Sequence, residues 1–389
     1  MGEHGSSPQA GERARARHAV EESRRANRLV MMLVVPVGLL LVIGMGAILS
    51  ASSVVAIGEG VDNLHYFKRQ LIWMGAGLVA MVGAALIPLR LLRRLVFPLF
   101  AVTVLLLAAT LVAGTRANGA TRWLFVGPIS VQASELAKLT TILFLALVVS
   151  RKEGSMHRIR DFLWPVALSV GVVGMLVLRQ PDLGTALMIA FGAFAVLLVS
   201  AAPLRYVLGG AVLGSGAALA AAFSSPYRWA RVTSFLDMGG DPLGGGYQVT
   251  QSLVALGTGG MFGVGLGASR ARWSFLPNAH TDFIFSIIGE ETGLAGSLVV
   301  VLLFLALTTA GMLIAFRAAD RFGRLTAIGI TTWLACQALV NIGGVVGLLP
   351  ITGVPLPFVS VGGSALLTAM AAVGILIGVA RSSPAGGSR

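Results

Sequence analysis

The chain of 389 residues is 56% hydrophobic and only 12% charged, and its mean hydropathy is +0.86. Soluble domains carry about a quarter charged residues, so the composition excludes an ordinary soluble protein and predicts a membrane protein. The net charge is +13, but no basic stripe with interleaved aromatic residues is present, so nucleic-acid binding is not expected. The single cysteine, Cys336, excludes a disulfide or a cysteine-based metal site within one chain.

The first 27 residues are polar and lack apolar periodicity, so we expect 1–27 to be a disordered, basic cytoplasmic tail. The apolar run that follows, at about 29–49, is preceded by basic residues as a signal peptide would be. Its length exceeds the usual signal core of about 7–15 residues. We therefore expect a retained first membrane span.

Apolar runs recur along the whole chain, and a helix needs about 20 apolar residues to cross a bilayer. The 50 glycines of the chain would allow such helices to pack closely in lipid. The expected fold class is all-α: a polytopic integral membrane protein with ten transmembrane helices and both termini in the cytoplasm. The ten expected spans cover about 29–49, 70–88, 94–113, 135–150, 162–178, 183–202, 204–223, 283–312, 325–345 and 363–380.

Orientation follows from the basic residues. With the N-terminus inside, 19 of the 29 lysines and arginines fall on cytoplasmic segments and nine on outer segments, while Lys138 sits within a span. The excess of positive charge favours cytoplasmic termini. The membrane domain is expected to cover 28–381, followed by a short cytoplasmic tail at 382–389. Its outer loop 224–281, between spans seven and eight, is far longer than ordinary connections, so function is expected outside.

The large outer loop has two features of its own. Its segment 247–256, "YQVTQSLVAL", predicts a short amphipathic helix at the membrane interface, with Gln248, Gln251 and Ser252 toward the polar side. The glycines at 257–267 lack the spacing of a dinucleotide fingerprint, and they indicate close helix packing instead.

The segment 276–293, "LPNAHTDFIFSIIGEETG", places Asp282 at the start of an apolar run. Asp282 either caps the N-terminus of the eighth span or has a functional role, since an acidic side chain deep in a span costs about 2.5–3.5 kcal/mol. If the helix includes Asp282, small residues at Ser286, Gly289 and Gly293 would share its face and leave it facing a cavity. A general base and a proton-coupled transporter both suit such a carboxylate.

Six stretches, in order over about 300 residues, resemble the SEDS family (shape, elongation, division and sporulation proteins). They are "FKRQLIW" (67–73), "NGATRWLFVGPISVQASELAKL" (118–139), "RQPDLGTA" (179–186), "DPLGGGYQVTQSL" (241–253), "LPNAHTDFIFSIIGEETG" (276–293) and "GLLPITGVPLPFVSVGGS" (347–364). The chain is more similar to the division branch, FtsW, than to the elongation branch, RodA. One departure is Ala133, where the family usually has proline.

The resemblance implies a ten-span peptidoglycan glycosyltransferase that polymerises lipid II outside the bacterial cytoplasmic membrane, at the division septum or, as the alternative, in RodA-like elongation of the lateral wall. It implies transfer of a glycan held on undecaprenyl diphosphate to the 4-hydroxyl of an incoming GlcNAc, with Asp282 as the catalytic residue. The implied partners are a class B penicillin-binding protein, which is a transpeptidase, and other divisome membrane proteins. No resident metal is expected, because His65 and His280 each lack a second ligand at a suitable spacing. Binding of a divalent cation to the diphosphate is compatible with the sequence.

Cations that can grip the diphosphate are Arg122, Arg228, Arg231 and Arg270, with Lys138 as a candidate inside the membrane. The other substrate-binding candidates are Trp123, Glu135, Asp182, Gln248, Gln251, His280, Glu290, Ser360 and Ser364. Structural alternatives exist for several of them. Glu135, three residues before Lys138, can simply neutralise it, Asp182 can cap a helix, and Trp123 can anchor the chain at the interface.

Two other functions compete with the enzyme. A lipid II flippase would also use intramembrane polar residues, but it needs access from both faces, and the inner loops here are short. A scaffold that only recruits a synthase would not need Asp282 for polymerisation.

Overall fold

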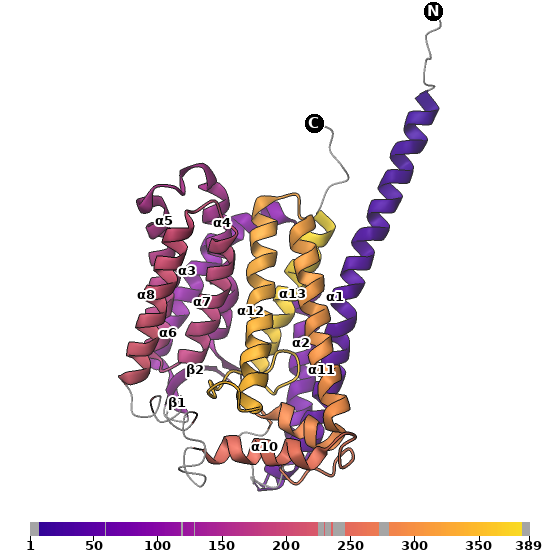
Figure 1. Ribbon diagram of the computed structural model, residues 1–389, viewed down its shortest axis with the longest axis vertical. Coiled ribbons are helices and arrows are strands. Elements are labelled where there is room, and N and C mark those ends of the chain that lie inside the picture. The colour runs from indigo at the N-terminus through magenta and orange to yellow at the C-terminus, as the bar shows by residue number, and fades with distance from the viewer. Residues whose placement is uncertain are drawn as a thin grey trace, which may run out of the picture.

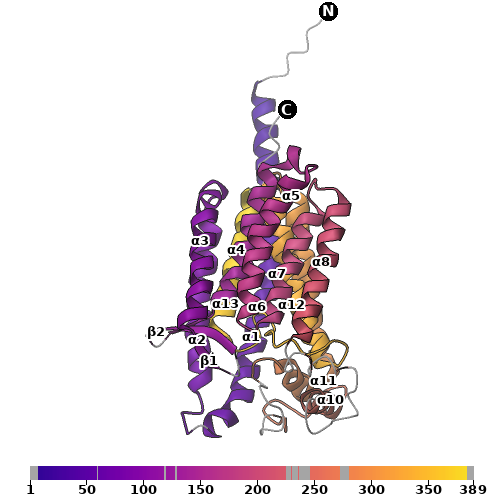
Figure 2. The same ribbon diagram turned by 90° about the vertical axis from the view of Figure 1, so that its left-hand side faces the viewer.

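A computed structural model describes residues 8–58, 60–117, 120–127, 129–224, 229, 235, 246–271 and 280–382. Most helices run roughly along one common axis (Figures 1 and 2). The helices are α1 (Pro8–Gly58), α2 (His65–Leu86), α3 (Leu89–Ala113), α4 (Ala133–Arg151), α5 (Ile159–Val166), α6 (Val173–Arg179), α7 (Leu183–Leu198), α8 (Leu204–Phe223), α10 (Tyr247–Gly259), α11 (Ile284–Arg317), α12 (Arg321–Val345) and α13 (Gly363–Ser382). Helix α10 lies across one end of the bundle (Figure 1).

Shorter elements connect the helices. A 3-10 turn, η1 (Glu153–Ser155), precedes α5, and a π-helical turn, η2 (Ala167–Val172), joins α5 to α6. The strands β1 (Thr115–Ala117), β2 (Ala120–Val126) and β3 (Ile129–Val131) form an antiparallel sheet in that order. This sheet lies between α3 and α4, near the end of the bundle that carries α10 (Figure 1).

Within the described residues, nine helical segments are long and apolar enough to cross a membrane, and α7 is a shorter apolar helix. The segment Ile159–Arg179, which contains α5, η2 and α6, counts as one of the nine. Together these segments coincide with the ten apolar runs expected from the sequence. The prediction of an all-α, multi-pass membrane protein is confirmed.

The N-terminal prediction is wrong in one respect. Helix α1 begins at Pro8, and its candidate span begins only at Arg24, so residues 8–27 are helical rather than disordered. This segment is rich in alanine, arginine and glutamate, which have high helix propensity. A helix already nucleated by the span extends through such residues at little cost, even without an apolar face.

The start of α1 and the end of α13 lie at the same end of the bundle, and α10 lies at the other (Figure 1). This arrangement is the one that an even number of spans requires. The most buried spans are those of α4, α12 and α13, in which 83%, 67% and 78% of the apolar 18-residue stretch is buried. These three helices form the centre of the molecule, while α2 and α8, each 11% buried, present most of their surface outward.

Helix α11 is broken at Gly293, whose φ of 71° and ψ of −166° are not helical. A break frees backbone groups that must find partners when water is scarce. A loop that follows α10 supplies them. The N–H groups of Val264 and Gly265 donate to the carbonyls of Glu290 and Glu291 at 2.9 and 3.1 Å, and those of Leu294 and Ala295 donate to the carbonyls of Gly260 and Met261 at 2.9 and 3.1 Å.

Three glycines let the loop approach this break. A Cβ built at Gly259 would overlap the backbone of Gly289, and one at Gly263 would overlap the backbone of Glu291. A Cβ at Gly293 would in turn overlap the backbone of Gly263. The glycine-rich segment therefore serves close packing, as expected.

Gly263→Ala should lower the melting temperature of the purified protein more than Gly267→Ala does. Both glycines have left-handed φ values, +81° and +76°, but only Gly263 faces backbone atoms within 4 Å. Left-handed backbone costs alanine about 1–2 kcal/mol, and overpacking adds about 1–3 kcal/mol. Thermal unfolding in detergent measures the difference. Equal losses for the two variants would mean that the loop does not press on the broken helix.

Candidate functional site

Asp282 lies in the turn that leads into α11 and is partly exposed. It lines a small cleft whose other walls come from α12 and from the loop between α12 and α13. The lining residues are Asp282, Phe283, Val340, Asn341, Gly344, Val345, Ile351, Thr352, Gly353 and Val354. The start of α11 and the end of α12, which border the cleft, lie at the end of the bundle opposite the start of α1 and the end of α13, near α10 (Figure 1).

The expectation that Asp282 shares a helix face with Ser286, Gly289 and Gly293 is wrong. The N-cap of α11 is Phe283, so Asp282 precedes the helix and does not hold the capping position. At the other end of the expected stripe, Gly293 interrupts the helix. Ser286 points elsewhere, because its hydroxyl is hydrogen-bonded to that of Ser252 on α10 at 2.7 Å. Asp282 nevertheless reaches a cleft, which is formed by α12 and its following loop.

Two amides of α12 hold that loop in place. The Nδ2 group of Asn341 donates to the carbonyls of Asp282 and Val354, each at 2.9 Å. One turn earlier, the Nε2 group of Gln337 donates to the carbonyl of Pro355 at 2.8 Å. Two successive carbonyls are therefore held by side chains four residues apart on one helix face. This arrangement fixes the wall of the cleft and the backbone of Asp282 together.

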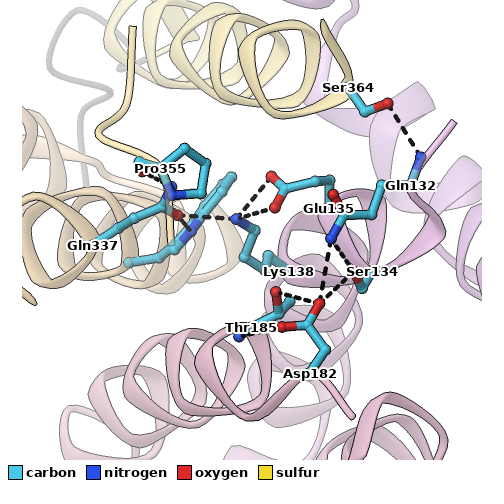
Figure 3. Close-up of polar contacts among 10 residues, drawn as sticks. Gln132, Ser134, Glu135, Lys138, Asp182, Thr185, Gln337, Pro355 and Ser364 are labelled. Atoms are coloured by element: carbon cyan, nitrogen blue, oxygen red, sulfur yellow. Dashed lines mark hydrogen bonds and ion pairs between the residues drawn. The ribbon is translucent and has the colours of Figure 1, made fainter. Parts of the chain in front are cut away.

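Gln337 also connects the loop to a buried ion pair (Figure 3). Lys138 is fully buried, and its Nζ lies 2.8–2.9 Å from the two carboxylate oxygens of Glu135. The same Nζ donates to Oε1 of Gln337 at 2.9 Å and lies 5.2 Å from the ring centroid of Trp333. Trp333 Nε1 donates to that Oε1 as well, at 2.8 Å. The alternative that Glu135 neutralises Lys138 matches this geometry.

Asp182 is the N-cap of α7 and gathers four hydrogen bonds (Figure 3). Its carboxylate accepts from the backbone N–H and the hydroxyl of Thr185 at 3.2 and 2.9 Å. It also accepts from the hydroxyl of Ser134 at 3.1 Å and from Nε2 of Gln132 at 3.3 Å. Asp182 thus performs the capping role and joins the start of α4 to the start of α7.

Arg122, on β2, closes the outer side of this cluster. One of its guanidinium nitrogens lies 3.9 Å from the carboxylate of Asp182, and its Nε donates to the carbonyl of Gln180 at 3.3 Å. A further nitrogen donates to the carbonyl of Pro181. The side chain keeps 28% of its surface exposed, so it can still meet an anion from outside. Its neighbour Trp123 is half-buried on the same strand.

Glu290 is buried and bound to the large outer loop. Its carboxylate accepts from the backbone N–H groups of Arg270 and Ala271 at 2.9 and 3.2 Å, and from the hydroxyl of Ser269. Glu290 does not line the cleft of Asp282. Its neighbour Glu291 accepts from the hydroxyl of Ser50 on α1. Both carboxylates therefore fasten α11 to other segments.

Of the two serine candidates, Ser360 stabilises the loop between α12 and α13, and Ser364 joins the start of α13 to the segment between β3 and α4. The hydroxyl of Ser360 accepts from the N–H of Leu356 at 2.9 Å. That of Ser364 accepts from the N–H of Gln132 at 3.2 Å and donates to the carbonyl of Ser130 at 3.4 Å. The ring centroid of His280 lies 5.4 Å from that of Tyr66, the second residue of α2, with the rings tilted by 42°, and the carbonyl of His280 accepts from the N–H of Val361 at 3.1 Å.

The remaining candidates lie away from the cleft or outside the described residues. Gln248 and Gln251 are half-buried on α10, and the side chain of Arg270 is exposed. Arg228 and Arg231 lie outside the described residues. Among the described residues, no group of three or more His, Cys, Asp or Glu side chains is suited to hold a metal ion.

Sequence reasoning missed three residues of this region. Gln337 and Asn341 are amides four residues apart within an apolar span, and this spacing, which places both on one helix face, could have indicated a shared polar role. Arg69 stands in the "FKRQLIW" motif, and its guanidinium donates to the hydroxyl of Ser130 at 2.8 Å. Two sets of polar contacts therefore meet at the loop after α12: one runs from Glu135 and Lys138 through Gln337 to Pro355, and the other joins Val354 through Asn341 to the backbone of Asp282.

The arrangement is suited to proton abstraction at an outer surface. Asp282 supplies a carboxylate in a narrow cleft, and Asn341 restricts the movement of its backbone. Arg122 supplies partly exposed positive charge near the same end of the bundle. A carboxylate and a guanidinium at the mouth of a bundle can act on a substrate that carries both a hydroxyl and an anionic group.

Lys138→Met should destabilise the protein strongly, by about 3–5 kcal/mol, because it leaves the buried carboxylate of Glu135 without a cation. The double variant Glu135→Leu/Lys138→Met should recover part of that loss, since neither charge then remains. Thermal unfolding in detergent compares the two. A double variant that loses as much as the two single variants together would contradict the expected coupling.

Asn341→Leu should lower the melting temperature as well, because two carbonyls lose their donor at a cost of about 1–3 kcal/mol for each group left unpaired. Asn63→Leu is the matched control, since Asn63 is an exposed amide before α2. Identical melting curves for both variants would show that the amide of Asn341 does not hold the loop.

Comparisons with known proteins agree with the geometry. The family model for cell cycle proteins of the FtsW, RodA and SpoVE type matches residues 30–384. Stage V sporulation protein E of Bacillus subtilis is 38% identical, over 91% of this chain and 97% of its own length. A probable peptidoglycan glycosyltransferase FtsW of Coxiella burnetii is 39% identical, over 88% of this chain and 93% of its own length.

Solved structures are similar over the same range. A chain from a peptidoglycan synthase complex that coordinates polymerisation and crosslinking aligns with a TM-score of 0.72 and 31% identity, covering 90% of this chain and 97% of that one. RodA of Thermus thermophilus aligns with a TM-score of 0.66 and 29% identity, covering 91% and 97%. The motifs, the multi-pass helical fold and these matches lead to one conclusion: the chain belongs to the FtsW/RodA/SpoVE family, which is the SEDS family.

Proposed function

We propose that the chain is a peptidoglycan glycosyltransferase that polymerises lipid II at the outer face of the bacterial cytoplasmic membrane. Relatives at 36–40% identity over most of the chain carry the name of that activity. The observation that carries the proposal is the cleft of Asp282, which opens at the end of the bundle opposite the chain termini. With the termini inside, that end faces outward.

The reaction is a displacement at the anomeric carbon of the growing glycan. Asp282 removes the proton from the 4-hydroxyl of the acceptor GlcNAc, and the resulting oxygen forms a bond to that carbon. The bond from the carbon to the undecaprenyl diphosphate oxygen breaks, and the diphosphate leaves with the electron pair. Positive charge near the leaving group stabilises it, which is the role proposed for Arg122, with a divalent cation on the diphosphate as a further contribution.

The proposed setting is septal cell-wall synthesis. Several relatives are named FtsW, and the sequence resembles that branch. A class B penicillin-binding protein is the proposed partner, which crosslinks the new strands, together with other membrane proteins of the divisome. The related solved chain comes from a complex that joins polymerisation to crosslinking.

The test is reconstitution of the purified protein with its transpeptidase partner and lipid II, followed by detection of glycan strands. Asp282→Asn and Asp282→Ala should slow polymerisation by roughly 10²–10⁴-fold, the usual contribution of a general base. Both variants should melt at the wild-type temperature. Asp62→Asn is the matched control, because Asp62 is an exposed carboxylate between α1 and α2 that pairs with Lys68 at 2.6 Å. Strands made by Asp282→Asn at the wild-type rate would remove the general-base role.

A lipid II flippase is the alternative, and detergent separates the two functions. In detergent micelles no membrane sides exist, so a flippase produces no polymer, whereas a polymerase does. A fluorescent fusion protein imaged in dividing cells tests the septal setting. Uniform labelling of the lateral wall would instead favour elongation.

A further inference from the structure

The loop that pins the break in α11 carries large apolar side chains on its outer side. We call residues 260–267 the outer apolar loop. Met261, Phe262 and Leu266 are 62%, 84% and 83% exposed, and Val264 is 41% exposed. So much exposed apolar surface within one loop of eight residues marks an interaction site.

Helix α10 continues this surface. Its buried side carries Val249, Ser252 and Ala255, and Ser252 donates to the carbonyl of Val345 at 2.6 Å. Its exposed side carries Leu253 and Val254, at 40% and 55% exposure. The predicted amphipathic helix is thus present, but the expected polar orientation of Ser252 is wrong. No charged residue occurs from 247 to 269.

The surface is also continuous with the flank of α11. Its exposed leucines recur every three or four residues from Leu294, and therefore lie along one face: Leu294 at 56%, Leu298 at 52%, Leu302 at 51% and Leu305 at 60%. This stripe belongs to a membrane-spanning helix, so it faces lipid. The N–H of Leu294 donates to Gly260, which fixes the outer apolar loop at the outer end of the stripe.

Two further contacts indicate how deep the loop lies relative to the membrane spans. The hydroxyl of Ser50 donates to Glu291, and the candidate span of α1 ends at Ser52. Glu291 therefore lies level with the outer end of the apolar span of α1. Because Gly265 donates to the carbonyl of Glu291, the loop lies at the same level. Its exposed side chains sit at the boundary between the hydrocarbon and the lipid headgroups.

Half of the backbone N–H groups of the outer apolar loop are paired within the protein. Those of Gly260, Gly263, Val264 and Gly265 donate to backbone carbonyls, at 3.3, 2.7, 2.9 and 3.1 Å. Unpaired backbone groups are costly in hydrocarbon, so the remaining N–H groups have to reach water or headgroup oxygens, and the loop suits the boundary region rather than the hydrocarbon core. A protein partner is less well matched, since protein interfaces carry a polar rim and about one hydrogen bond per 100–200 Å².

We infer that the outer apolar loop, together with Leu253 and Val254 of α10, inserts into the outer leaflet of the membrane. The inserted side chains anchor the segment that closes the broken helix. Amphipathic segments of this kind bury their apolar face about 5–10 Å into the boundary between headgroups and acyl chains.

Spin labels test the insertion in the full chain. In a Cys336→Ala background, single variants Phe262→Cys and Leu266→Cys are labelled with a nitroxide and placed in liposomes of phosphatidylethanolamine and phosphatidylglycerol. Collisions with oxygen and with a water-soluble nickel chelate measure depth. Both labels should lie about 5–10 Å below the phosphates and be poorly accessible to the nickel chelate. Leu298→Cys is the lipid-facing control, and Asp62→Cys is the aqueous control.

Nickel accessibility at 262 and 266 equal to that at position 62 would overturn the insertion. Protection that arises only after the transpeptidase partner is added would also overturn it, because the surface would then be a protein interface. A second measurement uses the unmodified chain, which avoids any folding defect of the variants. An apolar photoreactive probe dissolved in the bilayer should label residues 260–267 as strongly as the stripe of α11, and labelling of the stripe alone would contradict insertion.

Discussion

The geometry of the outer half of the molecule depends on one constraint: a helix broken at membrane depth must have its backbone groups paired. Gly293 breaks α11, and four hydrogen bonds from a loop about 30 residues earlier in the chain satisfy the freed groups. The short helix before the break is thereby held in a direction of its own. Asp282 stands at the start of that short helix, so its position follows from the pairing at the break.

A second set of interactions supports the opposite wall. Lys138 and Glu135 are buried together, and Gln337 links them to the loop beside Asp282. A buried ion pair adds little net stability, because desolvation offsets most of the attraction. Its role here is to fix the relative positions of neighbouring elements. The polar groups have few alternative partners in an apolar bundle, so they select one register of α4, α12 and the loop.

Much of the fold was readable from composition and spacing. The ten apolar runs, the shared side of the termini and the pairing of Glu135 with Lys138 three residues later follow from local rules, and so does the capping role of Asp182. The break at Gly293 could not be predicted, because the sequence does not distinguish a glycine with left-handed backbone from one that only allows close helix packing. Asn341 was missed since its partners, Asp282 and Val354, lie on other segments. The helical extension of α1 was missed because the prediction relied on apolar periodicity, whereas propensity decides there.

The short helix α7 has a consequence for the polar groups around it. Its 16 residues reach only about 24 Å at 1.5 Å per residue, whereas the hydrocarbon core is about 30 Å thick. Most of α7 is buried and packs against α4, α8 and α12, so protein rather than lipid has to cover an end that stops short of the headgroups. Backbone groups at such an end need partners within the protein. At the start of α7, the carboxylate of Asp182 and the guanidinium of Arg122 supply them.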